Sequence, residues 1–189
     1  MQKLAIKLTN YVVYKGVVKE EERKVYEYGF QTGLEVSLSF LISIVIAALG
    51  HMLLEGLLFL AIFIPLRSYA GGMHLEHYSY CLILSNLTYA GILLIVKLIA
   101  VPMLFSILLL SVFIAAVWVM YPVKHMNRPI DRGEEIYFKK QLKRFLLADA
   151  ALAIVFLLLK SDKYLLLMMV TFFLMVITML VGKYKELRE

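Results

Sequence analysis

The run LIAVPMLFSILLLSVFIAAVWVMY, residues 98–121, carries no charged side chain and is long enough to cross a bilayer as a helix. The whole chain has the same character, since 62% of its 189 residues are hydrophobic and only 18% are charged. The mean hydropathy of +0.81 lies well above that of soluble globular domains. The sequence therefore predicts an integral membrane protein that forms a single domain, residues 1–189.

Further apolar runs recur along the chain and define its architecture. Together with the first run, they cover residues 34–50, 52–65, 80–96, 98–121, 145–159 and 164–181. These runs predict an all-α polytopic membrane protein with about six transmembrane helices. The run 52–65 is short for a hydrocarbon core about 30 Å thick, and it contains Glu55. Three alternatives stay open for it: a tilted helix, a locally thinned bilayer, or one arm of a re-entrant hairpin.

Residues 1–30 are mixed in charge and have no long apolar core, so we do not expect a cleaved signal peptide. Apolar side chains recur there at helical spacing among lysines, at Leu4, Leu8, Tyr11 and Val12. The pattern predicts an amphipathic N-terminal helix at the cytoplasmic membrane interface, although an ordinary packing helix gives the same pattern.

Basic residues are concentrated in two segments, 1–30 and 122–144, whereas the other connections between apolar runs are short and carry few. Lys and Arg flanking membrane segments are retained on the cytoplasmic side. We therefore expect a multi-pass protein of the cytoplasmic membrane with both termini inside and residues 66–80 also facing the cytoplasm. The net charge of +6 is explained by these loops, so no nucleic-acid partner is expected.

The stretch RSYAGGMHLEHYSYC, residues 67–81, places several reactive groups at a predicted membrane boundary. Cys81 is the chain's only cysteine, so it forms no internal disulfide and is either inert or a nucleophile. In a straight helix His77 lies one turn from Cys81, whereas His74 requires a bend or a second protomer to reach the thiol. The alternative is that Cys81 only packs and both histidines are interfacial polar groups.

The Gly71-Gly72 pair is the next candidate, because exposed backbone N–H groups of glycines can bind an oxyanion. Taken alone the pair is a weak signal, since ordinary loops also contain such pairs. A metal site is not expected, because His74, Glu76 and His77 do not share one helical face and no HExxH motif is present. No phosphate-binding GxxxxGK[ST] motif occurs either, so no cofactor is expected.

The pattern of Arg67, the glycine pair, His74 and Cys81 resembles the accessory gene regulator B (AgrB) family of bacterial membrane cysteine endopeptidases. The segment PVKHMNRPI, residues 122–130, also resembles a cytoplasmic segment of that family. The resemblance implies that Cys81 is the nucleophile and His74 the catalytic base. It further implies supporting roles for Arg67, Gly71 and Gly72. His77 is not carried over from the family and stays an alternative base.

The implied reaction removes the C-terminal tail of a quorum-sensing pro-peptide through an acyl-enzyme thioester and closes a thiolactone ring. The implied partners are an AgrD-like precursor of a cyclic autoinducing peptide, the lipid bilayer and a second copy of the chain in a homodimer. A different class of function also stays open, namely a non-enzymatic peptide exporter or scaffold. In that case Glu35, Glu55 and Asp149 near the apolar runs would mark a polar pathway.

A cluster of basic residues precedes the run 145–159. It consists of Lys139, Lys140, Lys143 and Arg144, which recur at helical spacing. These side chains are candidates for binding the acidic tail of the precursor that the resemblance implies. They could equally serve only to retain the loop in the cytoplasm.

Overall fold

The computed structural model describes residues 1–71, 78–121 and 132–188, and this part of the chain is helical with short connections. The helices in chain order are α1 (Gln2–Tyr14), the 3-10 turn η1 (Glu20–Glu22), α2 (Arg23–Leu49), α3 (Leu53–Ala70), α4 (Tyr78–Leu98), α5 (Met103–Met120), α6 (Arg132–Leu158) and α7 (Asp162–Arg188). No strand occurs in the described ranges. The predicted all-α fold is confirmed.

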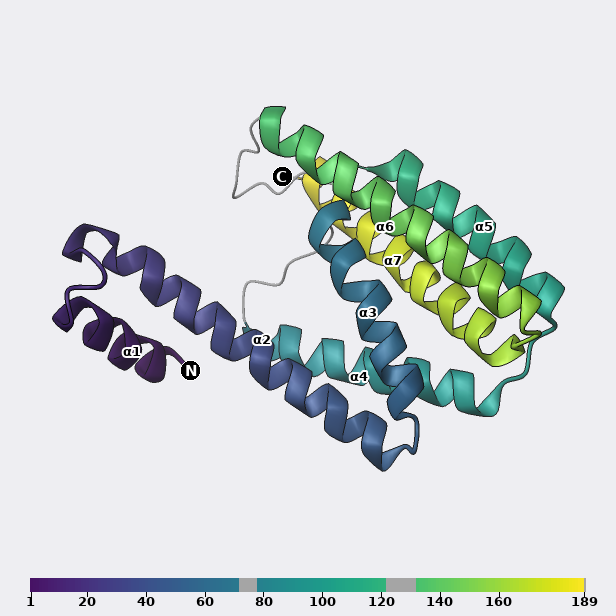
Figure 1. The fold of residues 1–189 in the computed structure, drawn as a ribbon, viewed down its shortest axis with the longest axis horizontal. Coiled ribbons are helices and arrows are strands. Elements are labelled where there is room, and N and C mark those ends of the chain that lie inside the picture. The colour runs from purple at the N-terminus through teal and green to yellow at the C-terminus, as the bar shows by residue number, and fades with distance from the viewer. Residues whose placement is uncertain (72–77, 122–131, 189) are drawn as a thin grey trace.

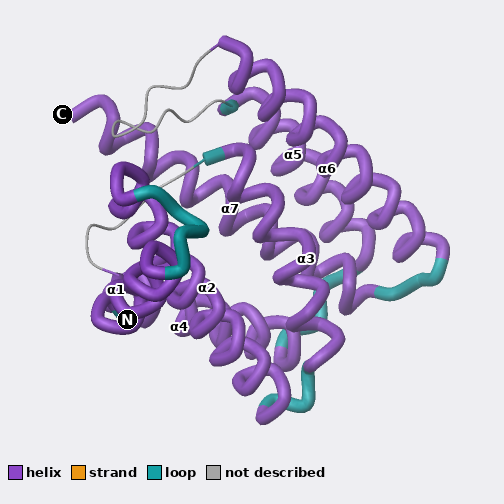
Figure 2. The backbone as a smooth tube through the Cα atoms, turned by 60° about the vertical axis from the view of Figure 1, so that its left-hand side comes forward, coloured by secondary structure: helices purple, strands orange, loops and turns teal. Residues whose placement is uncertain are grey.

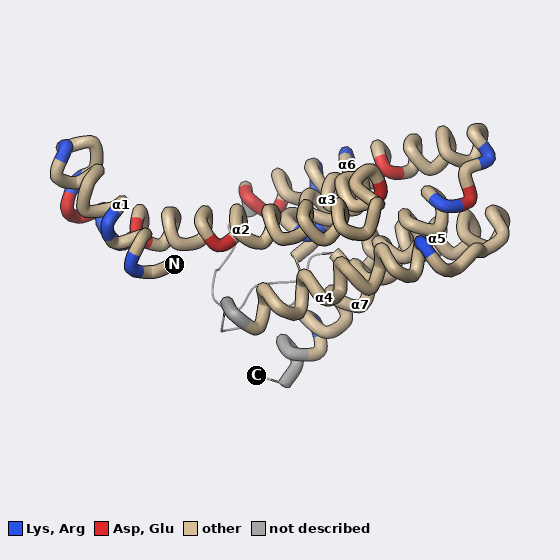
Figure 3. The backbone as a smooth tube through the Cα atoms, turned by 90° about the horizontal axis from the view of Figure 1, so that it is seen from below, with Lys and Arg blue, Asp and Glu red and all other residues tan. Residues whose placement is uncertain are grey.

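Five of these helices, α2, α3, α4, α5 and α7, are long and apolar enough to cross a membrane. Helix α5 contains no charged residue and α4 carries only Lys97. Figure 3 shows charged residues gathered in α1 and at the adjoining start of α2. The predicted polytopic membrane protein is therefore confirmed. In α6 charged residues extend as far as Arg144 and the apolar stretch that follows contains Asp149, so its crossing of the membrane stays a prediction.

Helix α3 settles the geometry of the short apolar run. Pro65 lies inside the helix, where its missing N–H removes one backbone hydrogen bond, yet the helix continues to Ala70. Its 18 residues span about 27 Å, close to the thickness of the hydrocarbon core. The segment is therefore one continuous helix that extends beyond the apolar run 52–65, and its tilt and depth in the bilayer stay predictions.

The helices form two packed groups that share α3 and α7. Figures 1 and 2 show α2 and α4 on one side and α5 and α6 on the other, with α3 and α7 between them. The larger core joins α3, α5, α6 and α7 through buried residues such as Leu66, Leu110, Leu142 and Phe172. Half of the apolar stretch of α7 is buried, a larger share than in the other four candidate spans, so α7 is the central helix.

The smaller core joins α2, α3, α4 and the first turns of α7, and it contains one close contact between helices. A Cβ atom on Gly56 of α3 would lie 2.1 Å from the hydroxyl of Tyr89 and 2.7 Å from the Cβ of Ala47. The Tyr89 ring meets the edge of Phe59 with 5.4 Å between ring centroids. Glycine at position 56 thus allows α2, α3 and α4 to approach one another, as small residues do in membrane proteins.

Helix α1 runs antiparallel along the first half of α2 (Figure 1). Ala5 and Thr9 are fully buried, and the Thr9 hydroxyl donates to the Ala5 carbonyl at 2.9 Å. At the other end of this hairpin, Arg23 binds Glu20 at 2.5 Å and donates to the side chain of Asn10. The structure thus shows α1 as a packing helix, and its place at a membrane interface stays a prediction.

Candidate active site

Cys81 and Arg67 come from consecutive helices whose ends lie at the same end of the bundle. Arg67 is in the last turn of α3 and Cys81 is in the first turn of α4. The guanidinium of Arg67 is half-buried, and it interacts electrostatically with the Cys81 side chain. The Cys81 side chain is exposed on the described chain. Two residues of the predicted site are therefore brought together.

The surroundings of Cys81 include the N-terminal end of α4 and the charged side chain of Arg67. The N-terminal turn of a helix presents unpaired backbone N–H groups and the positive end of the helix dipole. A guanidinium adds a positive charge that is retained at any physiological pH. A cysteine in such electropositive surroundings is a reactive nucleophile, whereas a cysteine packed in an apolar core is inert. The exposed position of Cys81 at the start of α4 fits a nucleophile, and its role stays a prediction.

Gly71 ends α3 directly after the turn that carries Arg67. Its backbone has φ 81° and ψ −164°, a combination that is essentially restricted to glycine, and the residue is buried. The glycine is thus required for the path that the chain takes out of α3. Gly72, His74 and His77 lie outside the described residues, so their roles stay predictions.

The helix that carries Cys81 is anchored by a polar contact to α2. Asn86 of α4 and Ser43 of α2 are both buried, and the Ser43 hydroxyl lies 3.2 Å from Oδ1 of Asn86. The Asn86 amide donates to the carbonyl of Leu82, the residue next to Cys81, at 2.8 Å. Sequence reasoning missed this pair. The signal in the sequence was weak, because each of the two apolar runs contains several polar residues: Glu35, Ser37, Ser39 and Ser43 in one, and Ser85, Asn86 and Thr88 in the other.

The predicted tail-binding residues share one side of α6. Lys139, Lys140, Lys143 and Arg144 are all exposed, and they lie away from the stripe of Leu142, Leu146 and Asp149 that is buried in the bundle. The ammonium of Lys139 lies 5.8 Å from the centroid of the Trp118 ring, which holds this lysine over α5. We call these four residues the basic face of α6.

The basic face belongs to the same end of the bundle as Arg67. Tyr69, two residues after Arg67, stacks on Phe145 with ring centroids 5.5 Å apart. It also meets Tyr137 and Phe138 edge to face at 6.4 and 5.9 Å. The segment of α6 that carries the basic face therefore packs beside the end of α3.

The ends of α5 and α6 are also held together at this end of the bundle. The Tyr121 hydroxyl donates to the backbone carbonyl of Glu135 at 3.1 Å. Burial and the nearby Glu135 carboxylate raise the pKa of Tyr121 above its usual value, so the donor keeps its proton at physiological pH. The start of the basic helix is thus fixed to α5. Residues 122–131, which include the family-like segment 122–130, lie outside the described part.

Sequence comparisons identify the family to which this site belongs. The sequence model of Accessory gene regulator B matches residues 5–179. The chain belongs to the AgrB family. An AgrB-like protein of Lactiplantibacillus plantarum is 31% identical over 103 residues, which are 54% of this chain and 52% of that relative. The matched region thus covers about half the length of this relative. No solved structure is significantly similar to the chain.

Membership of the AgrB family confirms the resemblance drawn from residues 67–81. The family is known for processing quorum-sensing peptides, and its substrate is a peptide at the membrane. Within the described ranges, no three His, Cys, Asp or Glu side chains gather closely enough to bind a metal ion. Since His74 and His77 lie outside those ranges, the absence of a metal or cofactor stays a prediction.

The three carboxylates of the predicted polar pathway sit on three different helices of this AgrB family member. Glu55 of α3 binds Lys163 of α7 at 2.5 Å. Glu35 of α2 accepts a hydrogen bond from Gln31 at 3.0 Å. Asp149 of α6 is buried, and its Oδ2 has no hydrogen-bond partner among the described residues. The Glu55 carboxylate is engaged in an ion pair, which favours a structural role for that residue.

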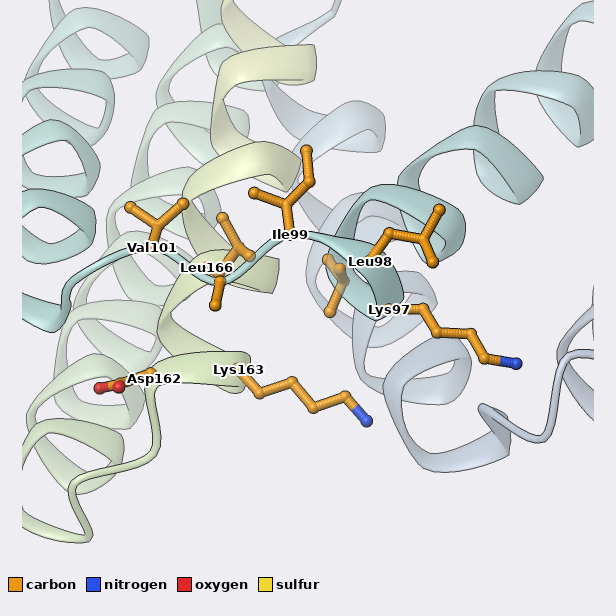
Figure 4. Close-up of a pocket in the computed structure, with 9 residues that line it drawn as sticks. Lys97, Leu98, Ile99, Val101, Asp162, Lys163 and Leu166 are labelled. Carbon is orange, nitrogen blue, oxygen red and sulfur yellow. The ribbon is translucent and has the colours of Figure 1, made fainter.

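A cavity of about 390 Å³ opens at the other end of the bundle (Figure 4). It is lined by Val96, Lys97, Leu98, Ile99, Ala100, Val101, Asp162, Lys163 and Leu166. Lys97 is sixteen residues after Cys81 on the same helix, which corresponds to about 24 Å along α4. The cavity is therefore separate from the site at Cys81.

Proposed function

We propose that this AgrB family member is a membrane cysteine endopeptidase that cleaves the C-terminal tail from a quorum-sensing pro-peptide and cyclises the product. The observation that carries the proposal is the pairing of Cys81, in the first turn of α4, with the guanidinium of Arg67 in the last turn of α3. Cys81 is also the chain's only cysteine, so no other residue can supply a thiol nucleophile.

In the proposed reaction, the Cys81 thiolate attacks the carbonyl carbon of the scissile peptide bond and forms a tetrahedral oxyanion. The backbone N–H groups of Gly71 and Gly72 stabilise this oxyanion. His74 protonates the leaving amine, the C–N bond breaks, and the C-terminal tail departs, leaving a thioester on Cys81. His77 is the alternative proton donor.

A cysteine thiol of the precursor then attacks the Cys81 thioester and gives its proton to His74. The C–S bond to Cys81 breaks, a thiolactone ring forms and the enzyme thiolate is regenerated. One thioester is exchanged for another, so the ring requires no nucleotide. Cyclisation competes with hydrolysis of the acyl-enzyme, and a site at the membrane boundary favours cyclisation by limiting water.

The distribution of basic residues supports a cytoplasmic site. The end of the bundle with Arg67 and Cys81 also carries the basic face of α6, Arg23 and the lysines of α1. The opposite end carries only Lys97, Lys160 and Lys163 among the described residues. By the positive-inside rule, the first end and both termini face the cytoplasm. The proposed partners are an AgrD-like precursor, the bilayer of a bacterial cytoplasmic membrane and a second protomer.

The decisive experiment is processing of a co-expressed tagged precursor in membranes. Cys81→Ala and His74→Ala should abolish cleavage, whereas His77→Ala should retain it, with equal amounts of each variant in the membrane by immunoblot. Cleavage by Cys81→Ala would refute the peptidase proposal. It would favour the exporter, for which the buried Asp149 carboxyl is the supporting observation.

The basic face of α6 is proposed to bind the acidic tail of the precursor. The double reversal Lys140→Glu with Lys143→Glu should raise KM for the precursor, because exposed charges that bind an acidic peptide act mainly on association. The matched control is Lys97→Glu with Lys160→Glu at the opposite end. An unchanged KM in the first double variant would remove this role.

A further inference from the structure

We propose that Ser43 and Asn86 are positioning residues for the reaction at Cys81. They hold the first two turns of α4, which carry the nucleophile, in a fixed place against α2. This inference rests on the proposed peptidase function and adds α2 to the helices, α3 and α4, that form the site.

The first observation is a chain of hydrogen bonds that ends beside the nucleophile. The Ser43 hydroxyl lies 2.9 Å from the Ser39 carbonyl and 3.2 Å from Oδ1 of Asn86, so its proton is shared between two acceptors. The Asn86 amide in turn donates to the Leu82 carbonyl at 2.8 Å. Because Leu82 directly follows Cys81, α2 is linked to the backbone at the nucleophile through two side chains.

The second observation is the order of burial along α4. The side chains of the residues from Tyr80 to Ser85 are exposed or half-buried, including Cys81 itself, and Asn86 is the first buried one described in this helix. The apolar anchors Tyr89, Ile92 and Leu93 follow only later. The turns that carry Cys81 therefore extend beyond the packed part of α4, and Asn86 lies at the point where the packing begins.

The third observation is the kind of contact. Burying a hydroxyl and a carboxamide in an apolar part of a membrane protein is unfavourable unless each is hydrogen-bonded, and one side-chain bond between membrane helices adds only about 0.6 kcal/mol to stability. Ser43 and Asn86 therefore contribute little to the overall fold. Their hydrogen bonds instead fix the position and orientation of the start of α4. This matters because a misplacement of about 1 Å at a reacting group can reduce the reaction rate about 100-fold.

The test uses purified enzyme in lipid nanodiscs and a fluorescent precursor. Ser43→Ala and Asn86→Ala should each lower kcat about tenfold while KM stays within about twofold, because substrate binding is intact and only the placement of the thiol is lost. The melting temperature should stay within a few degrees of wild type. The double variant Ser43→Asn with Asn86→Ser keeps both polar groups and the total volume, and it should recover most of kcat.

The matched control is Ser106→Ala, which removes a buried hydroxyl on α5 that has no hydrogen-bond partner among the described residues. It should leave kcat unchanged. The proposal is overturned if Ser43→Ala and Asn86→Ala retain wild-type kcat. It is equally overturned if kcat falls only in proportion to the folded fraction.

Cys81→Ala measured in parallel separates the two proposals. If Cys81→Ala still cleaves the precursor, the peptidase function itself fails and the positioning role falls with it. If Cys81→Ala is inactive while Ser43→Ala and Asn86→Ala are fully active, only the positioning role fails.

Discussion

Arg67 is a charged side chain in the last turn of an otherwise apolar helix, and charges in such places need a specific reason. Its guanidinium is half-buried and interacts with Cys81, so the positive charge acts on the sulfur through surroundings that screen it less than bulk water. In the proposed reaction, Arg67 would stabilise negative charge that develops at Cys81.

The first prediction concerns this charge. Arg67→Gln should reduce the rate of alkylation of Cys81 by iodoacetamide at pH 7 by about threefold to tenfold, because the thiolate is the reactive form and loses its nearby cation. Mass spectrometry of the protein measures the rate directly, since the chain has no other cysteine. Arg67→Lys should keep most of the rate, and Lys97→Gln on the same helix as Cys81 is the control. Equal rates in Arg67→Gln and wild type would contradict the electrostatic role.

Gly71 carries the second prediction at this scale. Gly71→Ala should lower precursor cleavage strongly, because φ 81° with ψ −164° costs roughly 1–3 kcal/mol for a residue with a Cβ atom. The chain would then leave α3 along a different path, directly after Arg67. Gly29→Ala in α2 is the control, since its Cβ would meet no atom within 4 Å. If both variants cleaved equally well, the backbone at Gly71 would have no part in the site.

The residues of the site were predictable only where the chemistry is local. Arg67, Gly71 and Cys81 could be selected from the sequence because they belong to one short stretch of unusual composition. Ser43 and Asn86 could not be paired in this way, because they are 43 residues apart and their contact depends on the rotation of two helices. A single sequence gives the period of each helix but not the register between helices.

The helices themselves were largely predictable, and the errors have physical reasons. Apolar runs marked α2, α4, α5 and α7 because lipid-facing and packed faces are both apolar in such helices. The start of α6 was missed, since its first turns are exposed and charged, so the helix begins at Arg132 instead of Phe145. Hydropathy marks the part of a helix that lies in lipid, not the part that continues beyond it.

The third prediction concerns the close approach of α2, α3 and α4. Gly56→Ala should lower the melting temperature by several degrees, because its Cβ would overlap the Tyr89 hydroxyl at 2.1 Å and the helices would have to separate. Gly91→Ala in α4 is the matched control, because no atom lies within 4 Å of its added Cβ. Thermal unfolding in detergent, followed by circular dichroism, measures both variants. An equal decrease in melting temperature in Gly56→Ala and Gly91→Ala would argue against the tight contact at Gly56.

At the scale of the whole molecule, one ion pair links parts of the chain that are distant in sequence. Glu55 in the first turn of α3 binds Lys163 in the first turn of α7, 108 residues later. The Glu55 side chain is only 10% exposed, whereas that of Lys163 is 47% exposed. Loss of the partner should therefore destabilise the fold more when it leaves the Glu55 carboxylate unpaired than when it leaves the Lys163 ammonium unpaired.

The fourth prediction follows from that asymmetry. Lys163→Met should lower the melting temperature more than Glu55→Gln, because it leaves a nearly buried carboxylate unpaired, whereas Glu55→Gln leaves a lysine that water can still solvate. The exposed Lys160→Met in the same turn is the control and should have little effect. Differential scanning fluorimetry of the purified variants measures the order. The reverse order of the two melting temperatures would refute this reading of the pair.

Because α3 belongs to both cores, substitutions in this helix affect the packing of both. Leu58 and Phe63 of α3 each pack against both cores. A change of size at either position is therefore transmitted to helices that do not contact each other directly. Substitutions in the two cores should not be energetically independent, in contrast to the additivity of distant sites in most proteins. Homologous chains would then have to vary their two cores together, with compensating changes passing through α3 and α7.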